Sequence, residues 1–137
     1  MEPINYFHTE QYHNTASAEE VLPFVINLVG PSSIIDVGCG TGTWLKVAKK
    51  LGVKVIMGID GIHVDSKMLC IEEQEFLQHN LNLPLDVGRK FDLGISLEVA
   101  EHLPAAAAGN FIEVLTRHSD IILFSAAVPG QIGRAHV

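Results

Sequence analysis

The chain has 137 residues and a formal net charge of −7, and 47% of its residues are hydrophobic. A length of this order fits one domain with its own core, and no apolar run approaches the roughly 20 residues that a membrane helix needs. Lys and Arg are scattered, so we expect neither nucleic acid nor a membrane as a partner. The N-terminus lacks the regions of a signal peptide and the two cysteines lie far apart, which favours a cytoplasmic location.

The N-terminal part of the chain predicts an arm followed by a helix. Residues 1–16 are polar with interspersed aromatic side chains and are expected to form the arm. Ser17 is expected to cap the helix, because acidic residues follow it in what would be the first turn. Apolar residues then recur at helical spacing until a Gly-Pro pair at positions 30–31 ends the helix.

After this helix, apolar strands alternate with helices. The strands are predicted at 32–37, 53–59, 74–79, 91–97 and 119–127, the helices at 43–51 and 104–117, and an irregular segment at 62–70. This alternation predicts an α/β fold of three layers, with a parallel sheet between helices, and right-handed crossovers give the strand order 3-2-1-4-5. Ligands of such sheets bind at the carboxyl ends of the strands, where the first and fourth strands diverge.

The first predicted strand runs into a loop with Gly at every second position, and an acid precedes the loop. Asp36 is followed by Gly38, Gly40 and Gly42, and Thr43 comes next. Glycine lets a ligand lie against bare backbone, because it lacks a Cβ and tolerates positive φ. A dinucleotide fingerprint would require Gly at position 43, and the Asp36 carboxylate would repel a pyrophosphate. The loop therefore favours a ligand with a positive charge.

A second acid, Asp60, ends the second predicted strand and precedes Gly61. An acid about 20 residues beyond a glycine loop can accept hydrogen bonds from both ribose hydroxyls of a nucleoside. The alternative is an ordinary turn aspartate. Together with the glycine loop, we expect Asp60 to bind a ribose.

The pattern D-x-G-x-G-x-G resembles the cofactor loop of the class I S-adenosylmethionine (SAM)-dependent methyltransferases. The resemblance implies a Rossmann-like methyltransferase sheet, SAM as cofactor, and an N-terminal arm that acts as a lid over it. It also implies adenine contacts from a polar residue and an apolar neighbour after the third strand, for which an ordinary turn is the alternative. Backbone contacts to the methionine part are implied from the end of the fourth strand. The implied cofactor-binding residues are Asp36, Gly38, Cys39, Gly40, Gly42, Thr43, Asp60, Gly61, Asn80, Leu81, Ser96 and Leu97.

The segment after the fourth strand carries Glu98, Glu101 and His102. In a helical turn these residues, spaced i, i+3 and i+4, would share one face beside the cofactor cleft. Three roles remain open. His102 can be a general base, since histidine exchanges protons near neutral pH. The cluster also resembles the divalent-cation segment of small-RNA 2′-O-methyltransferases and ubiquinone-pathway O-methyltransferases. The third role is a structural network that orients the loop.

The predicted function is SAM-dependent methyl transfer to an oxygen or nitrogen of a small-molecule acceptor. The first alternative is a non-catalytic SAM-fold module or partner subunit, which would not need Glu98, Glu101 and His102. The second is a nicotinamide oxidoreductase, which Asp36 and Thr43 disfavour. The sequence indicates neither the acceptor nor the oligomeric state.

The family resemblance also predicts strands six and seven, and we expect both to be missing from this chain. The incomplete SAM-binding domain is expected to cover residues 17–131. Residues 132–137 match one translated frame of a widely used short-read sequencing adapter. They are therefore expected to be a non-native tail, and the chain a fragment of a longer parent protein.

Overall fold

The computed structural model describes residues 2–126, with side chains described from Ala16 onward. Within this part of the chain five strands form one sheet, and helices and short 3₁₀ turns connect them. The strands are β1 (Ser33–Val37), β2 (Val55–Asp60), β3 (Phe76–Gln78), β4 (Leu93–Leu97) and β5 (Ile122–Ser125). The helices are α1 (Glu2–Val29), α2 (Thr43–Lys50) and α3 (Ala108–His118), and the 3₁₀ turns are η1 (Glu73–Glu75), η2 (Ala100–His102) and η3 (Ala105–Ala107).

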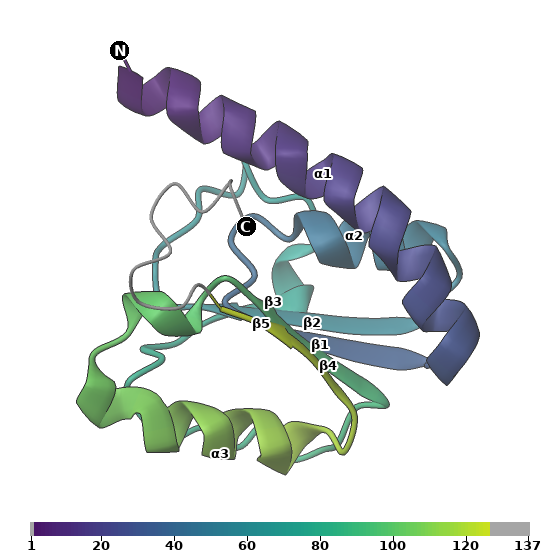
Figure 1. The fold of residues 1–137 in the computed structure, drawn as a ribbon, viewed down its shortest axis with the longest axis vertical. Helices are drawn as coiled ribbons and strands as arrows, with labels where there is room; N and C mark the ends of the chain where they lie inside the picture. The colour runs from purple at the N-terminus through teal and green to yellow at the C-terminus, as the bar shows by residue number, and fades with distance from the viewer. Residues whose placement is uncertain (1, 127–137) are drawn as a thin grey trace.

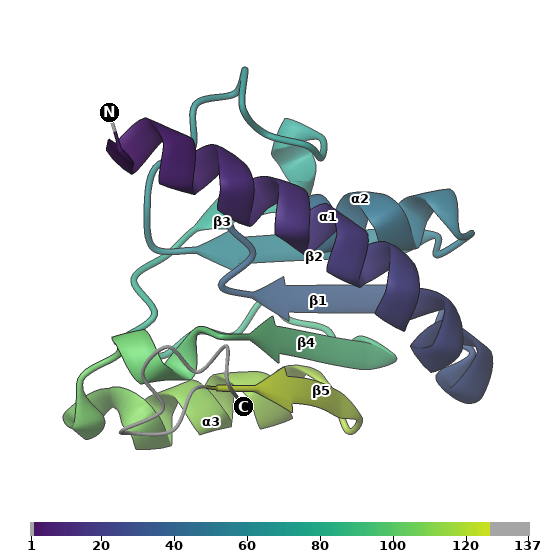
Figure 2. The ribbon, with the colours of Figure 1, turned by 45° about the horizontal axis from the view of Figure 1, so that its top comes forward.

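The sheet is parallel throughout, and its order is β3-β2-β1-β4-β5. Helices α1 and α2 cover one face of the sheet and α3 covers the other, which gives three layers (Figures 1 and 2). The predicted α/β class, the Rossmann-like architecture and the strand order are therefore confirmed. The described helices include none that is both long and apolar enough to cross a membrane.

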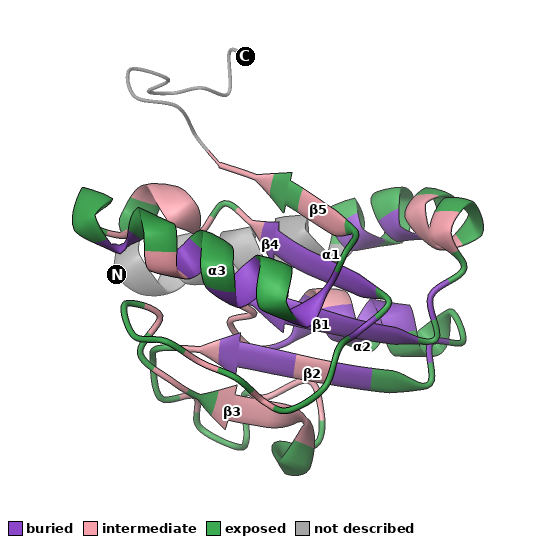
Figure 3. Cartoon of the chain, turned by 90° about the horizontal axis from the view of Figure 1, so that it is seen from below, coloured by how far each residue is buried: buried purple, intermediate pink, exposed green. Residues whose placement is uncertain are grey.

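The core lies on both faces of the central strands, as the burial colours of Figure 3 show. Successive side chains of a strand point to opposite faces. Ile34 of β1 accordingly packs with Leu22 of α1 and Leu45 of α2, whereas Ile35 packs with Phe111 of α3. By the same alternation, Asp36 shares the face of Ile34, below α1 and α2.

The predicted start of the first helix at Ser17 is wrong. Helix α1 already begins at Glu2, so Ser17 lies inside it and caps nothing. Only the first backbone N–H groups of a helix lack a carbonyl partner in the preceding turn. At Ser17 this preceding turn is present, so no N–H group there requires a side-chain cap. The lid role of residues 1–16 stays a prediction, since their side chains up to Thr15 lie outside the described ones.

Two further predicted segments differ from the structure. The turn after β4 is a 3₁₀ turn that begins only at Ala100, so Glu98 precedes it instead of sharing a helical face with His102. The fifth strand is shorter than predicted, and Ser119 forms only an isolated bridge with Phe91. The predicted end of that strand at Ala127 and the predicted tail at 132–137 lie outside the described residues.

His118 is the buried polar side chain that joins the end of α3 to the segment before β4. It is fully buried, its Nε2 accepts a hydrogen bond from the Val87 amide at 3.0 Å, and its Nδ1 lies 2.7 Å from the Val114 carbonyl oxygen. Because Nε2 is an acceptor, the proton belongs on Nδ1, which donates to Val114. The ring is therefore neutral and both of its nitrogens are paired.

Replacing His118 with leucine tests this connection. The variant leaves the Val87 amide without its acceptor, and we expect it to lower the free energy of unfolding by about 1–3 kcal/mol. Urea denaturation measures the change. Glu113→Gln, an exposed position on the same helix, should alter stability by no more than about 0.5 kcal/mol. Equal stability of the His118→Leu variant and the wild type would contradict the role given to the histidine.

Candidate functional site

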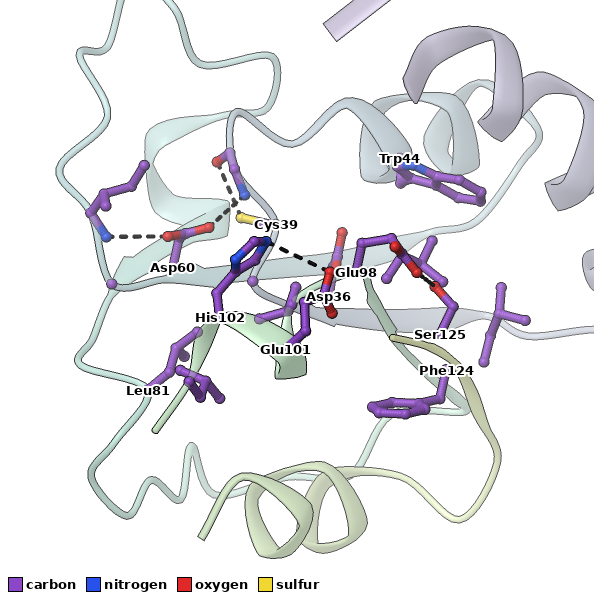
Figure 4. Close-up of a pocket in the computed structure, with 18 of the residues that line it drawn as sticks. Asp36, Cys39, Trp44, Asp60, Leu81, Glu98, Glu101, His102, Phe124 and Ser125 are labelled. Atoms are coloured by element: carbon purple, nitrogen blue, oxygen red, sulfur yellow. Dashed lines mark hydrogen bonds and ion pairs between the residues drawn. The ribbon is translucent and has the colours of Figure 1, made fainter. Parts of the chain in front are cut away.

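A cavity of about 1210 Å³ opens at the carboxyl ends of the strands, where β1 and β4 diverge. Figure 4 shows side chains from several elements converging on it. Most of the residues that the sequence indicated line this cavity: Asp36, Gly38, Cys39, Gly40, Asp60, Gly61, Asn80, Leu81, Leu97, Glu98, Glu101 and His102. The topology thus brings together residues that lie far apart along the chain.

Three predicted residues lie elsewhere. Thr43 is buried at the start of α2, and the side chain of Ile71 covers Gly42. Ser96 is fully buried within the sheet, and its hydroxyl has no hydrogen-bond partner among the described residues. Their predicted contacts with the cofactor therefore find no support in the lining of the cavity.

The glycine loop, residues 38–42, is held against the end of β2. The amides of Gly38 and Cys39 both donate to the Ile59 carbonyl, at 2.6 and 3.0 Å. Gly38 has φ +91°, and a Cβ there would lie 2.5 Å from the Val99 side chain. Gly38 is therefore required by packing. Gly40 has φ +58° but open space where its Cβ would be, so this part of the loop presents bare backbone to the cavity.

Asp60 is held in place by two backbone amides. Its Oδ2 accepts from the Gly40 amide at 2.7 Å and its Oδ1 from the Ile62 amide at 3.1 Å. A carboxylate oxygen has more than one acceptor site, so each remains able to accept a further hydrogen bond. The Asp60 carboxylate is thus fixed at the rim of the cavity with unused acceptor capacity.

Asp36 is a buried acid that faces the cavity. Its residue is 4% exposed, and among the described residues no donor contacts its carboxyl group. Burial, and after it the nearby charge of Asp60, raise the pKa of Asp36 from its ordinary value of 3.8 to about 8. A cation placed beside the carboxyl group would lower this pKa.

Cys39 contributes packing to the loop. Its sulfur lies over Gly58 of β2, where a Cβ would approach to 2.6 Å. Burial raises the pKa of the Cys39 thiol well above its usual range, and the charges of Asp36 and Asp60 act in the same direction. Since the thiolate is the reactive form, this shift disfavours Cys39 as a nucleophile.

The residues predicted after β3 to contact adenine both line the cavity, and Leu81 lies on the opposite side from Trp44 in Figure 4. The Asn80 side-chain oxygen accepts from the Asn82 amide at 2.9 Å, which forms a local turn. The Leu81 side chain is half-buried, and its carbonyl oxygen accepts from Asn110 of α3 at 3.3 Å. The two residues are therefore ordered at the rim without a bound ligand.

Glu98 adopts an unusual backbone conformation directly after β4. Its φ is +59°, and it is the one residue other than glycine with positive φ within the described range. The Glu98 amide donates to the Ser125 carbonyl at 2.8 Å, and the Ser125 hydroxyl donates to the Glu98 carboxylate at 2.9 Å. These two bonds to β5 hold Glu98 in a conformation that a side chain normally disfavours.

Glu101 and His102 lie apart from this pair. His102 Nε2 is 3.6 Å from Glu101 Oε2, and the histidine side chain is 76% exposed. Among the residues that the structure describes, no three His, Cys, Asp or Glu side chains lie close enough together to hold a metal ion. The predicted Glu98, Glu101 and His102 segment therefore does not form a set of cation ligands here.

Other residues that line the cavity were not predicted as site residues. They are mostly apolar or aromatic, and they include Val21 of α1, Trp44 of α2, and Leu123, Phe124 and Ser125 of β5. The sequence shows all of these except Ser125 only as apolar positions of a helix or strand. Their shared position at the cavity follows from the strand order and from α1 crossing the sheet.

The chain matches a protein family described as a methyltransferase domain, and the match covers residues 7–120. The chain belongs to this methyltransferase family. The ribosomal protein L11 methyltransferase of Hydrogenovibrio crunogenus (strain DSM 25203 / XCL-2) is 30% identical to it over 96 residues, which cover 66% of this chain and 31% of that protein. The predicted family of class I SAM methyltransferases is thus confirmed.

Solved methyltransferase structures share the fold of this methyltransferase domain. The plantazolicin methyltransferase BpumL, in complex with a monoazolic desmethylPZN analog and SAH, has a TM-score of 0.73 at 18% identity, over 97% of this chain and 55% of that one. The methyltransferase domain of bacterial CtHen1-CN gives 0.66 at 21% identity, over 81% and 65%. A TehB-like SAM-dependent methyltransferase from Corynebacterium glutamicum gives 0.63 at 17% identity, over 98% and 81%. The domain therefore spans about a third of the curated relative and between half and two thirds of the first two structures.

The raised pKa of Asp36 predicts how the stability of this methyltransferase domain depends on pH. Between pH 3.8 and about 8 the folded state keeps a proton on Asp36 that the unfolded chain has lost. The contribution of Asp36 to the free energy of unfolding is therefore complete below pH 3.8, the pKa in the unfolded chain. It is lost as the pH rises through about 8, the pKa in the folded state. We expect Asp36→Asn, which cannot ionise, to flatten this decline in urea denaturation across the interval.

Asp120→Asn is a matched control, because this exposed aspartate pairs with Lys90 at the surface. Surface ion pairs contribute at most about 1 kcal/mol, so the pH profile of this variant should follow the wild type. If the free energy of unfolding of Asp36→Asn declined with pH as steeply as that of the wild type, the decline could not be due to the raised pKa of Asp36.

Proposed function

We propose that this chain is the cofactor-binding part of an enzyme that transfers a methyl group from SAM to an oxygen or nitrogen of a small-molecule acceptor. The observation that carries the proposal is the joint position of Gly40, Asp60 and Asp36 around one cavity. They offer bare backbone, a fixed carboxylate and a buried acid that no donor contacts within the described part of the chain. The proposal is supported by the family match and by the fold shared with a methyltransferase solved with SAH.

The chemistry of SAM matches these groups one by one. Asp36 would bind the cofactor's ammonium group, since a cation offsets the cost of ionising a buried carboxyl. Asp60 would accept hydrogen bonds from the ribose hydroxyls, with Gly40 allowing the close approach. Asn80 and Leu81 would contact the adenine, one through its amide and the other through its apolar side chain.

SAM supplies a methyl group on a positively charged sulfur: the acceptor's lone pair forms the new bond to carbon, while the carbon–sulfur bond breaks and its electron pair stays on the sulfur. The protein's main contributions are then to align the acceptor and to exclude water. His102, with Glu101 beside it, would take up the proton that the acceptor loses. Because the described residues form no set of metal ligands, we assign no step to a cation.

Gly40→Ala tests the cofactor site. We expect it to weaken SAH binding in calorimetric titration by at least about tenfold, because the added methyl group enters the cavity. Gly30→Ala is the matched control: Gly30 has φ +66°, a Cβ there also meets nothing, and it does not line the cavity. Both variants should lose roughly 1–2 kcal/mol of stability through the left-handed backbone, and Gly30→Ala should bind SAH as the wild type does.

Titration of the wild-type chain with NAD serves as the ligand control, and we expect no heat of binding. Failure of the wild type to bind SAH, or equal SAH affinity of the two alanine variants, would count against the proposed site. SAH binding without methyl transfer to any acceptor in a panel of small amines, phenols and alcohols would favour a non-catalytic binding module instead.

His102→Ala tests the proposed base. We expect kcat for methyl transfer to fall by roughly 10²–10⁴-fold while SAH affinity stays within about twofold. The rate is measured as SAH release with the acceptor that the wild type methylates. A chelator should leave the wild-type rate unchanged, because no step is assigned to a metal. A loss of rate with chelator, or an unchanged kcat in the variant, would remove the histidine from this role.

A further inference from the structure

The cavity continues beyond the residues proposed for the cofactor. In Figure 4 Trp44, Phe124 and Ser125 lie on the opposite side from Asp60 and Leu81. Leu123 of β5 and Val21 of α1 also line the cavity. We call the part lined by Val21, Trp44, Leu123 and Phe124 the apolar end of the cavity. Its side chains offer no hydrogen-bond acceptor, and one donor only, on the Trp44 indole.

The charges around the cavity have one sign. The acidic residues that line it are Asp36, Asp60, Glu98 and Glu101, and no Lys or Arg lines it within the described part of the chain. His102 is the remaining titratable side chain apart from Cys39. A negatively charged acceptor would be repelled at this site, whereas a cationic group would be attracted.

Glu98 is the acid nearest to the apolar end that the proposed cofactor contacts do not use. Its carboxylate accepts from the Ser125 hydroxyl through Oε2, and among the described residues no donor contacts Oε1. A left-handed conformation costs roughly 1–2 kcal/mol for a residue with a side chain. Such a cost persists only where the surroundings impose it, and here two hydrogen bonds to Ser125 do so.

A second observation points to cationic ligands in the same cavity. Asp36 is 4% exposed and faces the cavity, and its carboxyl has no donor within the described residues. One positive group, the cofactor's ammonium, is proposed to bind there. Glu98 then remains as an unused anionic position at the boundary between the cofactor residues and the apolar end.

We propose that the apolar end binds the methyl acceptor and selects an amine carried on an apolar body, with Glu98 recognising the ammonium form and Ser125 positioning Glu98. This inference rests on the proposed function and narrows its acceptor to nitrogen. Bond formation requires the free lone pair, so the ammonium first gives its proton to the proposed base. No Lys or Arg lines the cavity within the described part of the chain, so phosphorylated and carboxylated small molecules are disfavoured as acceptors.

The test uses three probes with the same phenyl body: phenethylamine, 2-phenylethanol and 3-phenylpropionate. Each is titrated into the full chain saturated with SAH, and binding is followed by NMR. We expect the amine to bind at least about tenfold more tightly than the alcohol, and the carboxylate to bind most weakly. Glu98→Gln should remove the preference for the amine, and Ser125→Ala should reduce it several-fold.

Glu113→Gln is the control variant, because it removes an exposed carboxylate of α3 that does not line the cavity. It should keep most of the preference for the amine. Calorimetry with SAH checks every variant, and the SAH affinity should stay within about twofold of the wild type. Retained SAH affinity in Ser125→Ala, together with the weaker amine preference, separates a positioning role from a general loss of structure.

Several results would overturn the inference. They are equal or tighter binding of the alcohol or carboxylate, no detectable amine binding at millimolar concentration, survival of the preference in Glu98→Gln, and an equal loss in Glu113→Gln. Each of these with normal SAH binding refutes the amine acceptor and leaves the proposed function in place. Loss of SAH binding by the wild type refutes the proposed function itself.

Discussion

The hydrogen bond from the Gly40 amide to the Asp60 carboxylate joins the carboxyl ends of β1 and β2. The pairing of these strands runs on into the loop, where the amides of Gly38 and Cys39 share the Ile59 carbonyl. The loop is therefore fixed by the sheet and not by its own short sequence. Asp36, the exposed backbone of Gly40 and the Asp60 carboxylate depend on this connection for their positions around one cavity.

Much of the fold follows from local patterns in the sequence. Buried apolar segments such as 33–37 and 93–97 alternate with amphipathic helices, and this pattern is sufficient to indicate a parallel sheet and its order. The start of α1 does not follow in this way. Ser17 carries a capping signal, but such a signal states only that a helix can begin there. The signal does not exclude that the preceding residues are helical as well. In the structure they are, because α1 begins at Glu2.

The two sides of the cavity, the proposed cofactor side and the apolar end, differ in how much of each can be predicted from the sequence. The side with Gly40 and Asp60 can be predicted, because the spacing of the glycines and an acid at the end of the next strand form a recognisable pattern. The apolar end is not, because Val21, Leu123 and Phe124 are indistinguishable in sequence from core positions. The φ of +59° at Glu98 also has no local signal, since glutamate disfavours it and the bonds to Ser125 on another strand impose it. Ser96 and Thr43 show the converse, because polar residues beside the motif are buried away from the cavity.

The buried carboxyl of Asp36 couples the binding of a ligand cation in the cavity to the release of a proton. At neutral pH its raised pKa keeps a proton on the empty site. A ligand cation that binds beside it takes the place of that proton, which passes to the solvent. The measured heat of binding then contains the ionisation enthalpy of the buffer and changes from one buffer to another. Affinity for a cationic ligand rises with pH until Asp36 is ionised before the ligand arrives, and below that pH the exchange of a proton for the cation leaves the total charge of the site unchanged.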